Sequence, residues 1–281
     1  MNSENIRSNR KKYIKSAIVL LIVIALLLFC NFQNKHLETT HYTYEAEQLG
    51  VDLDGYRIVQ ISDLHNAKFG KNNQKLVDRI RECAPDMIVL TGDLVDSNHT
   101  NVDRAVQFVD EIVKICPVYY VTGNHEYWLD TSEYEKLMDG LASVGVIILD
   151  DQVVEISRGD AKFRLVGLDD KSLADGTLEA LLSDEKELTV VLAHEPQYFA
   201  RYAGTGVDLV LSGHAHGGQF RLPFVGGIVA PDQGFLPEYT AGEYYMNGTE
   251  MIVSRGLGNS VIPVRLFNYP EIVCVELVGK H

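Results

Sequence analysis

The sequence predicts an α/β fold of the four-layer αββα sandwich type, with two mixed sheets between outer helices, preceded by one N-terminal transmembrane helix. Three observations predict it. Short apolar runs alternate with amphipathic helical segments, adjacent short strands fill the second half, and a long apolar stretch lies near the N-terminus. We therefore expect a basic cytoplasmic end over 1–15, an anchor over 14–32, a tether over 33–52 and a globular domain over 53–281.

The apolar stretch is almost unbroken over 16–29, and its extension to 14–32 approaches the roughly 20 residues that span a bilayer. Five basic residues precede it within 1–15 and no comparable cluster follows, so the positive-inside rule places the N-terminus in the cytoplasm. The domain is then expected outside the cell membrane, on a single-pass anchor. A buried core helix and a cleaved signal peptide are the alternatives. However, the run ends in LLLFCNFQ without a small-residue cleavage pattern, and Phe29 before Cys30 does not fit a lipoprotein signal.

The elements of the domain follow in order along the chain. In the first half, strands are expected at 56–62, 87–90 and 118–121, and helices at 73–83, 102–115 and 132–144. In the second half, short strands are expected at 146–149, 153–156, 163–167, 190–193, 209–211, 244–246, 251–253 and 272–277. Asn247-Gly248 marks a hairpin turn between two of them. Two stacked sheets with helices outside account for this order.

The charge of the chain is unevenly distributed. The formal net charge is -14, and because residues 1–15 carry +4, the remaining residues carry -18. An acidic domain repels DNA, RNA and anionic membrane surfaces at long range, which disfavours nucleic acid as a partner. The four cysteines form no CxxC pair, so we interpret them as ordinary thiols.

Polar motifs follow five of the expected strands. They are Asp63-Leu64-His65, Gly92-Asp93-Leu94-Val95-Asp96, Gly123-Asn124-His125-Glu126, His194 and Gly213-His214-Ala215-His216. In open α/β sheets, ligands bind at this edge. Each motif alone is typical of a helix cap or a turn, but capping does not explain five of them in the same structural position. Carboxylate, imidazole and amide donors without a thiolate suit Mn, Fe or Zn, and seven donors with one bridging carboxylate fit two metal ions.

Taken in this order, the motifs DLH, GDLVD, GNHE, a single His and GHAH resemble those of the calcineurin-like metallophosphoesterase superfamily, whose fold is the metallo-dependent phosphatase sandwich. The runs GHAHGGQF and SRGLGNS further resemble a bacterial membrane-anchored branch that is UDP-2,3-diacylglucosamine hydrolase-like. The resemblance implies that Asp63, His65 and His216 hold one metal, that Asn124, His194 and His214 hold the other, and that Asp93 bridges them. It also implies that His125 is a catalytic histidine beside the substrate and that Asp96 orients it.

The expected function is hydrolysis of a phosphate ester by a metal-bridging hydroxide on the outer face of the membrane. Mn is the preferred metal, with Fe or Zn as alternatives, and His125 is expected to protonate the leaving group. Two other functions compete. A catalytically silent, membrane-tethered metal-binding or interaction module would be expected to have lost a ligand or His125, and the acidic charge disfavours a nuclease of the same fold. The sequence leaves open a monoester or a diester, a lipid-linked or a nucleotide-sugar substrate, and the oligomeric state.

Three phenylalanines, Phe220, Phe224 and Phe235, follow the GHAH motif in a stretch rich in Gly and Pro. Two interpretations are balanced here. These side chains could line an apolar groove for an acyl chain, or they could cover the end of the second sheet.

Overall fold

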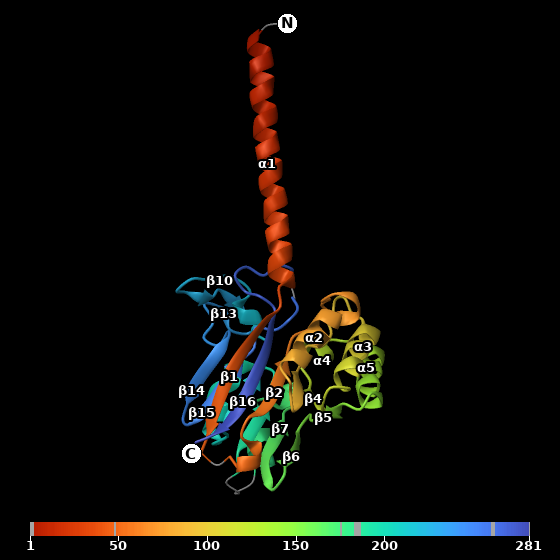
Figure 1. Cartoon of the computed structure of the whole chain (residues 1–281), viewed down its shortest axis with the longest axis vertical. Coiled ribbons are helices and arrows are strands. Elements are labelled where there is room, and N and C mark those ends of the chain that lie inside the picture. The colour runs from red at the N-terminus through yellow and green to blue at the C-terminus, as the bar shows by residue number, and fades with distance from the viewer. Residues whose placement is uncertain (1–2, 48, 175, 183–186, 260–261, 281) are drawn as a thin grey trace.

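The computed structural model describes residues 3–47, 49–174, 176–182, 187–259 and 262–280. Two mixed six-stranded sheets stack face to face in this part of the chain, as the sequence predicts (Figure 1). The first sheet has the order β1 (Glu38–Ala46), β16 (Glu271–Gly279), β2 (Tyr56–Ile61), β3 (Met87–Thr91), β4 (Val118–Val121) and β5 (Ile147–Ile148). The second has the order β14 (Gly242–Met246), β15 (Thr249–Val253), β9 (Leu209–Ser212), β8 (Thr189–Leu192), β7 (Ala161–Gly167) and β6 (Gln152–Arg158).

Helices cover the outer face of each sheet. The helices α2 (Gln74–Glu82), α3 (Val102–Ile112) and α5 (Thr131–Ser143) pack on the first sheet, and the short helices α6 (Thr177–Leu181) and α7 (Phe199–Gly204) pack on the second. A one-turn helix, α4 (Asn124–Tyr127), follows β4 directly. Two small hairpins extend one end of the molecule: β10 (Arg221–Leu222) with β11 (Gly226–Gly227), and β12 (Val229–Ala230) with β13 (Gly234–Phe235).

The central strands are apolar on both faces because each face has its own core. Along β3, Met87 and Val89 pack between the two sheets, whereas Ile88 and Leu90 pack under the helices. Side chains alternate between the two faces of a strand, so a strand buried on both faces is a continuous apolar run in the sequence. This is why the buried strands could be predicted from short apolar runs.

The helix α1 (Ser3–Lys35) contains the predicted anchor and projects away from the domain (Figure 1). Its stretch from Arg10 to Lys35 is long and apolar enough to cross a membrane, and the most apolar part of that stretch is not buried against the protein. An exposed apolar helical stretch of this kind matches the expected composition of a membrane span.

The segment 33–52 differs from the expected tether. Its first residues complete α1, and Glu38–Ala46 forms β1, which pairs in parallel with all nine residues of β16. The sequence of β1 is ETTHYTYEA, in which Thr and Tyr favour a strand, but its one exposed face makes the segment polar overall. Its partner strand is more than two hundred residues away, so local patterning could not show the pairing.

Candidate metal centre

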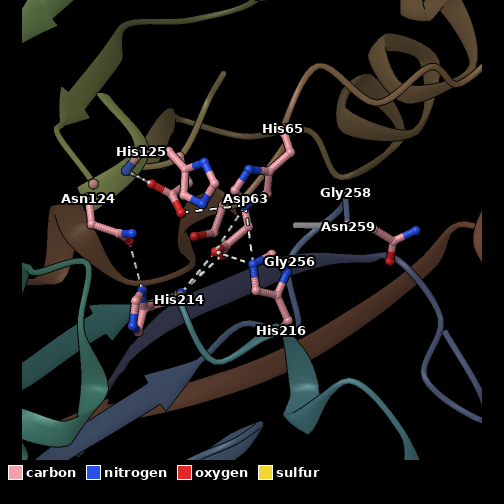
Figure 2. Close-up of polar contacts among 12 residues, drawn as sticks. Asp63, His65, Asn124, His125, His214, His216, Gly256, Gly258 and Asn259 are labelled. Atoms are coloured by element: carbon pink, nitrogen blue, oxygen red, sulfur yellow. Dashed lines mark hydrogen bonds and ion pairs between the residues drawn. The ribbon is translucent and has the colours of Figure 1, made fainter. Parts of the chain in front are cut away.

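All nine predicted site residues come together at the carboxyl ends of the strands. Figure 2 shows Asp63, His65, Asn124, His125, His214 and His216 among them. Asp63 and His65 follow β2, Asp93 and Asp96 follow β3, Asn124 and His125 follow β4, His194 follows β8, and His214 and His216 follow β9. The edges of both sheets thus contribute to a single cluster. With the exception of Asn124, these side chains are buried, so the cluster is held within the protein rather than on loose loops.

The first group consists of Asp63, His65, Asp93 and His216. The Nε2 atoms of His65 and His216 lie 3.2 Å apart, and His216 Nε2 lies 3.5 Å from Asp63 Oδ1. Ligands about 2.0–2.2 Å from a tetrahedral ion are separated from one another by about 3.3 Å. The spacing of these donor atoms therefore fits one divalent metal ion.

The second group consists of Asp93, Asn124, His194 and His214. Asn124 Oδ1 lies 3.2 Å from His194 Nε2 and 3.0 Å from His214 Nδ1, and these two nitrogens are 3.2 Å apart. The separations match those of the first group, and the donors are again imidazole, carboxylate and amide. This set fits a second ion of the same class.

Asp93 lies between the two groups. Its Oδ2 atom is 3.4 Å from His65 Nε2 and 3.3 Å from His194 Nε2. Its Oδ1 atom accepts a hydrogen bond from the backbone N–H of His125 at 2.9 Å, which leaves Oδ2 turned toward both groups. This position would suit a carboxylate shared by two cations.

Two of the histidines are oriented by hydrogen bonds from the ring nitrogen that faces away from the cluster. His194 Nδ1 donates to the Thr91 carbonyl at 2.7 Å, and His214 Nε2 donates to Asp232 Oδ2 at 2.9 Å. These bonds turn His194 Nε2 and His214 Nδ1 toward the other donors of the cluster, where each nitrogen could bind a metal ion. Asp232 could not be predicted as a partner of His214, because it lies on a loop outside every motif.

The electrostatics of the cluster favour neutral His65 and His216 imidazoles beside an ionised Asp93 carboxylate. Burial lowers the pKa of His65 to about 3, and burial together with the nearby Arg265 guanidinium holds the pKa of His216 well below its ordinary value. Burial opposes ionisation of Asp93, yet the His194 and His65 imidazoles keep its pKa well below the usual range. Neutral imidazoles and an ionised carboxylate are the forms that bind divalent cations. Against the effect of burial, the Asp93 carboxylate raises the pKa of His194 well above its ordinary value, so a metal ion that binds His194 would displace a proton from it.

Glu126 has a scaffolding position that the sequence did not reveal, although it is part of the GNHE motif. Its buried carboxylate accepts hydrogen bonds from the backbone N–H groups of Gly123 (2.8 Å), Asp93 (2.9 Å) and Leu94 (2.8 Å). Burial and the Asp93 carboxylate raise its pKa to about 8. Glu126 therefore ties the loop after β3 to the loop after β4 and fixes Asp93 relative to Asn124.

The backbone at the cluster is held in an uncommon conformation. Asp63, His65, Asp93, His214 and His216 have φ values of 50°, 43°, 53°, 63° and 47°. Residues other than glycine rarely adopt this left-handed region, and each such residue costs of the order of 1–3 kcal/mol. Hydrogen bonds between loops stabilise it, among them Asp63 N–H to the Gly92 carbonyl (3.1 Å) and His65 N–H to the Asp93 carbonyl (3.0 Å).

His125 lies at the side of the cluster, with its ring centroid 4.5 Å from that of His65 and 4.6 Å from that of Trp128. Ser97 contacts His125 Nδ1 through its backbone N–H (3.3 Å) and its hydroxyl (3.2 Å). The Asp96 carboxylate is in the same cluster, and its Oδ1 accepts bonds from the backbone N–H groups of Asn98 and His99. The role of Asp96 in orienting His125 stays a prediction, and Ser97 is a contact that the sequence did not indicate.

Comparison with known proteins identifies phosphoesterases of similar sequence. The family model described as calcineurin-like phosphoesterase matches residues 56–218. The uncharacterized metallophosphoesterase YkuE of Bacillus subtilis (strain 168) is 30% identical, with 98% of this chain and 99% of that protein aligned. The phosphodiesterase YaeI of Escherichia coli (strain K12) is 31% identical over 79% of this chain and 82% of that protein.

A relative whose name describes a transmembrane protein is also similar to this chain. The transmembrane protein with metallophosphoesterase domain of Danio rerio is 29% identical, with 83% of this chain and 55% of that protein aligned. The resemblance to a UDP-2,3-diacylglucosamine hydrolase-like branch stays a prediction. The family match and the relatives show a phosphoester hydrolase whose family typically binds two divalent metals, and the chain belongs to the calcineurin-like phosphoesterase family.

Proposed function

We propose that this protein hydrolyses a phosphate ester with two divalent metal ions on the outer face of a membrane. The observation that supports the two-metal reaction most strongly is the position of Asp93 Oδ2, 3.4 Å from His65 Nε2 and 3.3 Å from His194 Nε2. One carboxylate oxygen close to two separate donor groups is the arrangement expected of a bridging ligand.

In this proposal Asp63, His65 and His216 would hold the first metal, Asn124, His194 and His214 would hold the second, and Asp93 would be shared between them. Mn suits the mixed oxygen and imidazole donors best, and Fe or Zn suits them as well. When bound, the ions supply Lewis acidity toward the phosphoryl oxygens and make hydroxide available near neutral pH.

The protein's own contribution to the chemistry is His125. A backbone N–H can only donate, so the Ser97 contact uses His125 Nδ1 as an acceptor and leaves Nε2 as the ring nitrogen that carries a proton. A proton at Nε2 is available to the leaving oxygen of the ester as the phosphorus–oxygen bond breaks. Asp96 acts on this ring as a positioning residue in our proposal, and Trp128 packs against the same ring.

Two competing functions are less well supported. A silent metal-binding or interaction module would be expected to have lost a ligand or the catalytic histidine, but all nine predicted residues are present and clustered. A nuclease would need a surface that attracts nucleic acid, and the net charge of -14 disfavours such a surface.

A phosphodiester is our preferred substrate class over a monoester, and it could be lipid-linked or part of a nucleotide-sugar. The name of the Escherichia coli relative, a phosphodiesterase, supports this preference.

The decisive activity test is a panel of esters with the purified full chain in detergent. We expect turnover of bis-p-nitrophenyl phosphate, p-nitrophenyl phosphate or extracted phospholipid after Mn, Fe or Zn is added, measured as released product. Asp93→Ala is the matched control, because it removes the shared ligand of both metals. Equal inactivity of both proteins toward every ester with every metal would contradict the proposal.

The proposed topology has a separate test. If α1 crosses the membrane with its basic end in the cytoplasm, protease added to intact cells is expected to digest the domain, which lies beyond Lys35. A cytoplasmic marker protein in the same cells should stay intact until the cells are opened with detergent. Full protection of the domain in intact cells would rule out the outward orientation.

A further inference from the structure

Several large apolar side chains are exposed at the end of the domain from which α1 emerges. We call them the apolar rim, and they are Leu222, Phe224, Val225, Phe235, Leu236, Ile262 and Phe267. Phe224 and Phe235 are the most exposed, with 108% and 74% of their surface accessible. Scattered apolar residues are common on protein surfaces, but a concentration of phenylalanine and leucine on small hairpins marks an interaction site.

The rim lies beside the candidate membrane span. The Phe267 ring packs edge-on against the Phe29 ring of α1, with 6.0 Å between centroids. Phe29 belongs to the apolar stretch of α1, six residues before the helix ends at Lys35, which is about 9 Å along the axis. In Figure 1, β10 and β13 lie at the end of the domain where α1 begins to project. The rim is therefore level with the last turns of the anchor.

The anchor and the rim are joined rigidly. Asn34 near the end of α1 accepts a hydrogen bond from the backbone N–H of Arg265 (2.8 Å) and donates to the Pro263 carbonyl (2.8 Å). The loop with Phe267 in turn holds the first hairpin, because Arg221 N–H donates to the Leu266 carbonyl at 2.9 Å. These bonds fix the depth of the rim relative to the helix.

We propose that the apolar rim inserts into the surface of the same bilayer that α1 spans. The occupant of this surface is lipid, because α1 fixes the rim at the level of a membrane-embedded helix and aromatic side chains favour the interface. This inference rests on the proposed membrane anchoring by α1. It assigns Phe224 and Phe235 to the membrane, rather than to an acyl groove inside the protein or to the cover of the second sheet.

The position has a consequence for the substrate. The first hairpin begins five residues after His216, and Asp232, which orients His214, lies just before β13. The segments that carry the rim therefore follow the metal-centre residues closely in the sequence, and one of them contacts the centre through Asp232. We infer that the centre faces phosphoesters held at the membrane surface, such as phosphodiesters in lipid headgroups.

Depth-dependent quenching tests the insertion. We would make Phe224→Trp and Phe235→Trp in the full chain, reconstituted in phosphatidylcholine and phosphatidylglycerol vesicles with or without brominated acyl chains. The fluorescence of Trp128 is present in every variant and is subtracted. We expect brominated lipid to remove at least half of the remaining fluorescence, which comes from the new Trp, because the new indole contacts acyl chains.

Val51→Trp is the matched control. Val51 is 79% exposed and lies in a short helical turn at the other end of the domain. The nine residues of β1 separate this turn from α1, a distance of about 30 Å along the strand. Its fluorescence should be unchanged by brominated lipid. The inference would be overturned if none of the three variants lost fluorescence in brominated lipid relative to ordinary lipid. It would also be overturned by a blue shift of the emission that depends on protein concentration and occurs without quenching, because such a shift would show self-association.

Flotation of the vesicles separates this inference from the one it rests on. If the chain does not float with the vesicles, the membrane anchoring itself has failed. If the chain floats but the emission at positions 224 and 235 does not respond to bromine, only the insertion of the rim has failed. Neither readout needs catalytic turnover, so an inactive preparation still gives a result.

Discussion

Replacement of His125 by alanine is expected to lower kcat by ~10²–10⁴-fold while both metal ions stay bound. The seven proposed ligands do not include His125, and its ring lies beside His65 rather than between the two groups of donors. The loss therefore falls on proton transfer and charge stabilisation. Turnover of a soluble chromogenic diester and metal content by mass spectrometry, measured on the same preparation, check both halves of this expectation.

The nature of the leaving group makes the role of His125 specific. An alkoxide needs a proton more than p-nitrophenolate does, so the loss in His125→Ala should be larger for alkyl esters than for nitrophenyl esters. His99→Ala is the matched control, because the His99 side chain is 89% exposed and its ring lies 3.8 Å from Asp96, while the backbone N–H that bonds Asp96 is kept in the variant. A loss of equal size for both classes of ester, or a loss of metal, would assign His125 to structure or metal binding instead.

Much of the fold was predictable because the buried strands are short apolar runs with turn residues between them. The predicted strand 118–121 coincides with β4, and the strands and helices of the first half agree with the structure within a few residues. The short helices α6 and α7 and the hairpins from β10 to β13 were not predicted. Their bounds depend on packing against the second sheet and on local turns, not on a period in the sequence.

The site was predictable from the sequence only as a set of side chains. Topology alone places residues after parallel strands at one edge, so Asp63, Asp93 and His194 could be grouped before any coordinates were known. The supporting contacts could not be found in this way. Glu126 and Asp232 act across loops that are far apart in the chain, and no motif spacing relates Asp232 to His214.

The glycines around the centre are part of the same support, and they limit what the loops can tolerate. A Cβ atom on Gly213 would lie 1.8 Å from Ser62 Oγ and 2.5 Å from Asp63 Oδ2. Glycine is needed here for space, since Gly213 is not among the glycines with positive φ. The backbone of the next residue, His214, donates to both oxygens of Asp63, at 3.0 and 3.1 Å. Any side chain at position 213 must displace the carboxylate that this backbone holds.

We therefore expect Gly213→Ala to lose metal from the first group of ligands and to abolish phosphoesterase activity. Overpacking of this kind costs about 1–3 kcal/mol of folding stability. Added metal should raise the thermal unfolding temperature of the wild type by mass action, and it should raise that of the variant much less. Unfolding scans with and without metal, together with metal content, measure the effect.

Gly204→Ala gives the matched comparison for this substitution. Gly204 is the last residue of α7, and a Cβ atom there would meet nothing within 4 Å. Alanine at that position should stabilise the chain slightly, by about 0.4–1 kcal/mol, because it reduces the freedom of the unfolded state. The two variants add the same methyl group, so a difference in metal binding between them reports the space around Asp63. If Gly213→Ala kept two metals and wild-type turnover, Asp63 would not be held by close packing at this loop, and our assignment of it as a fixed ligand would fail.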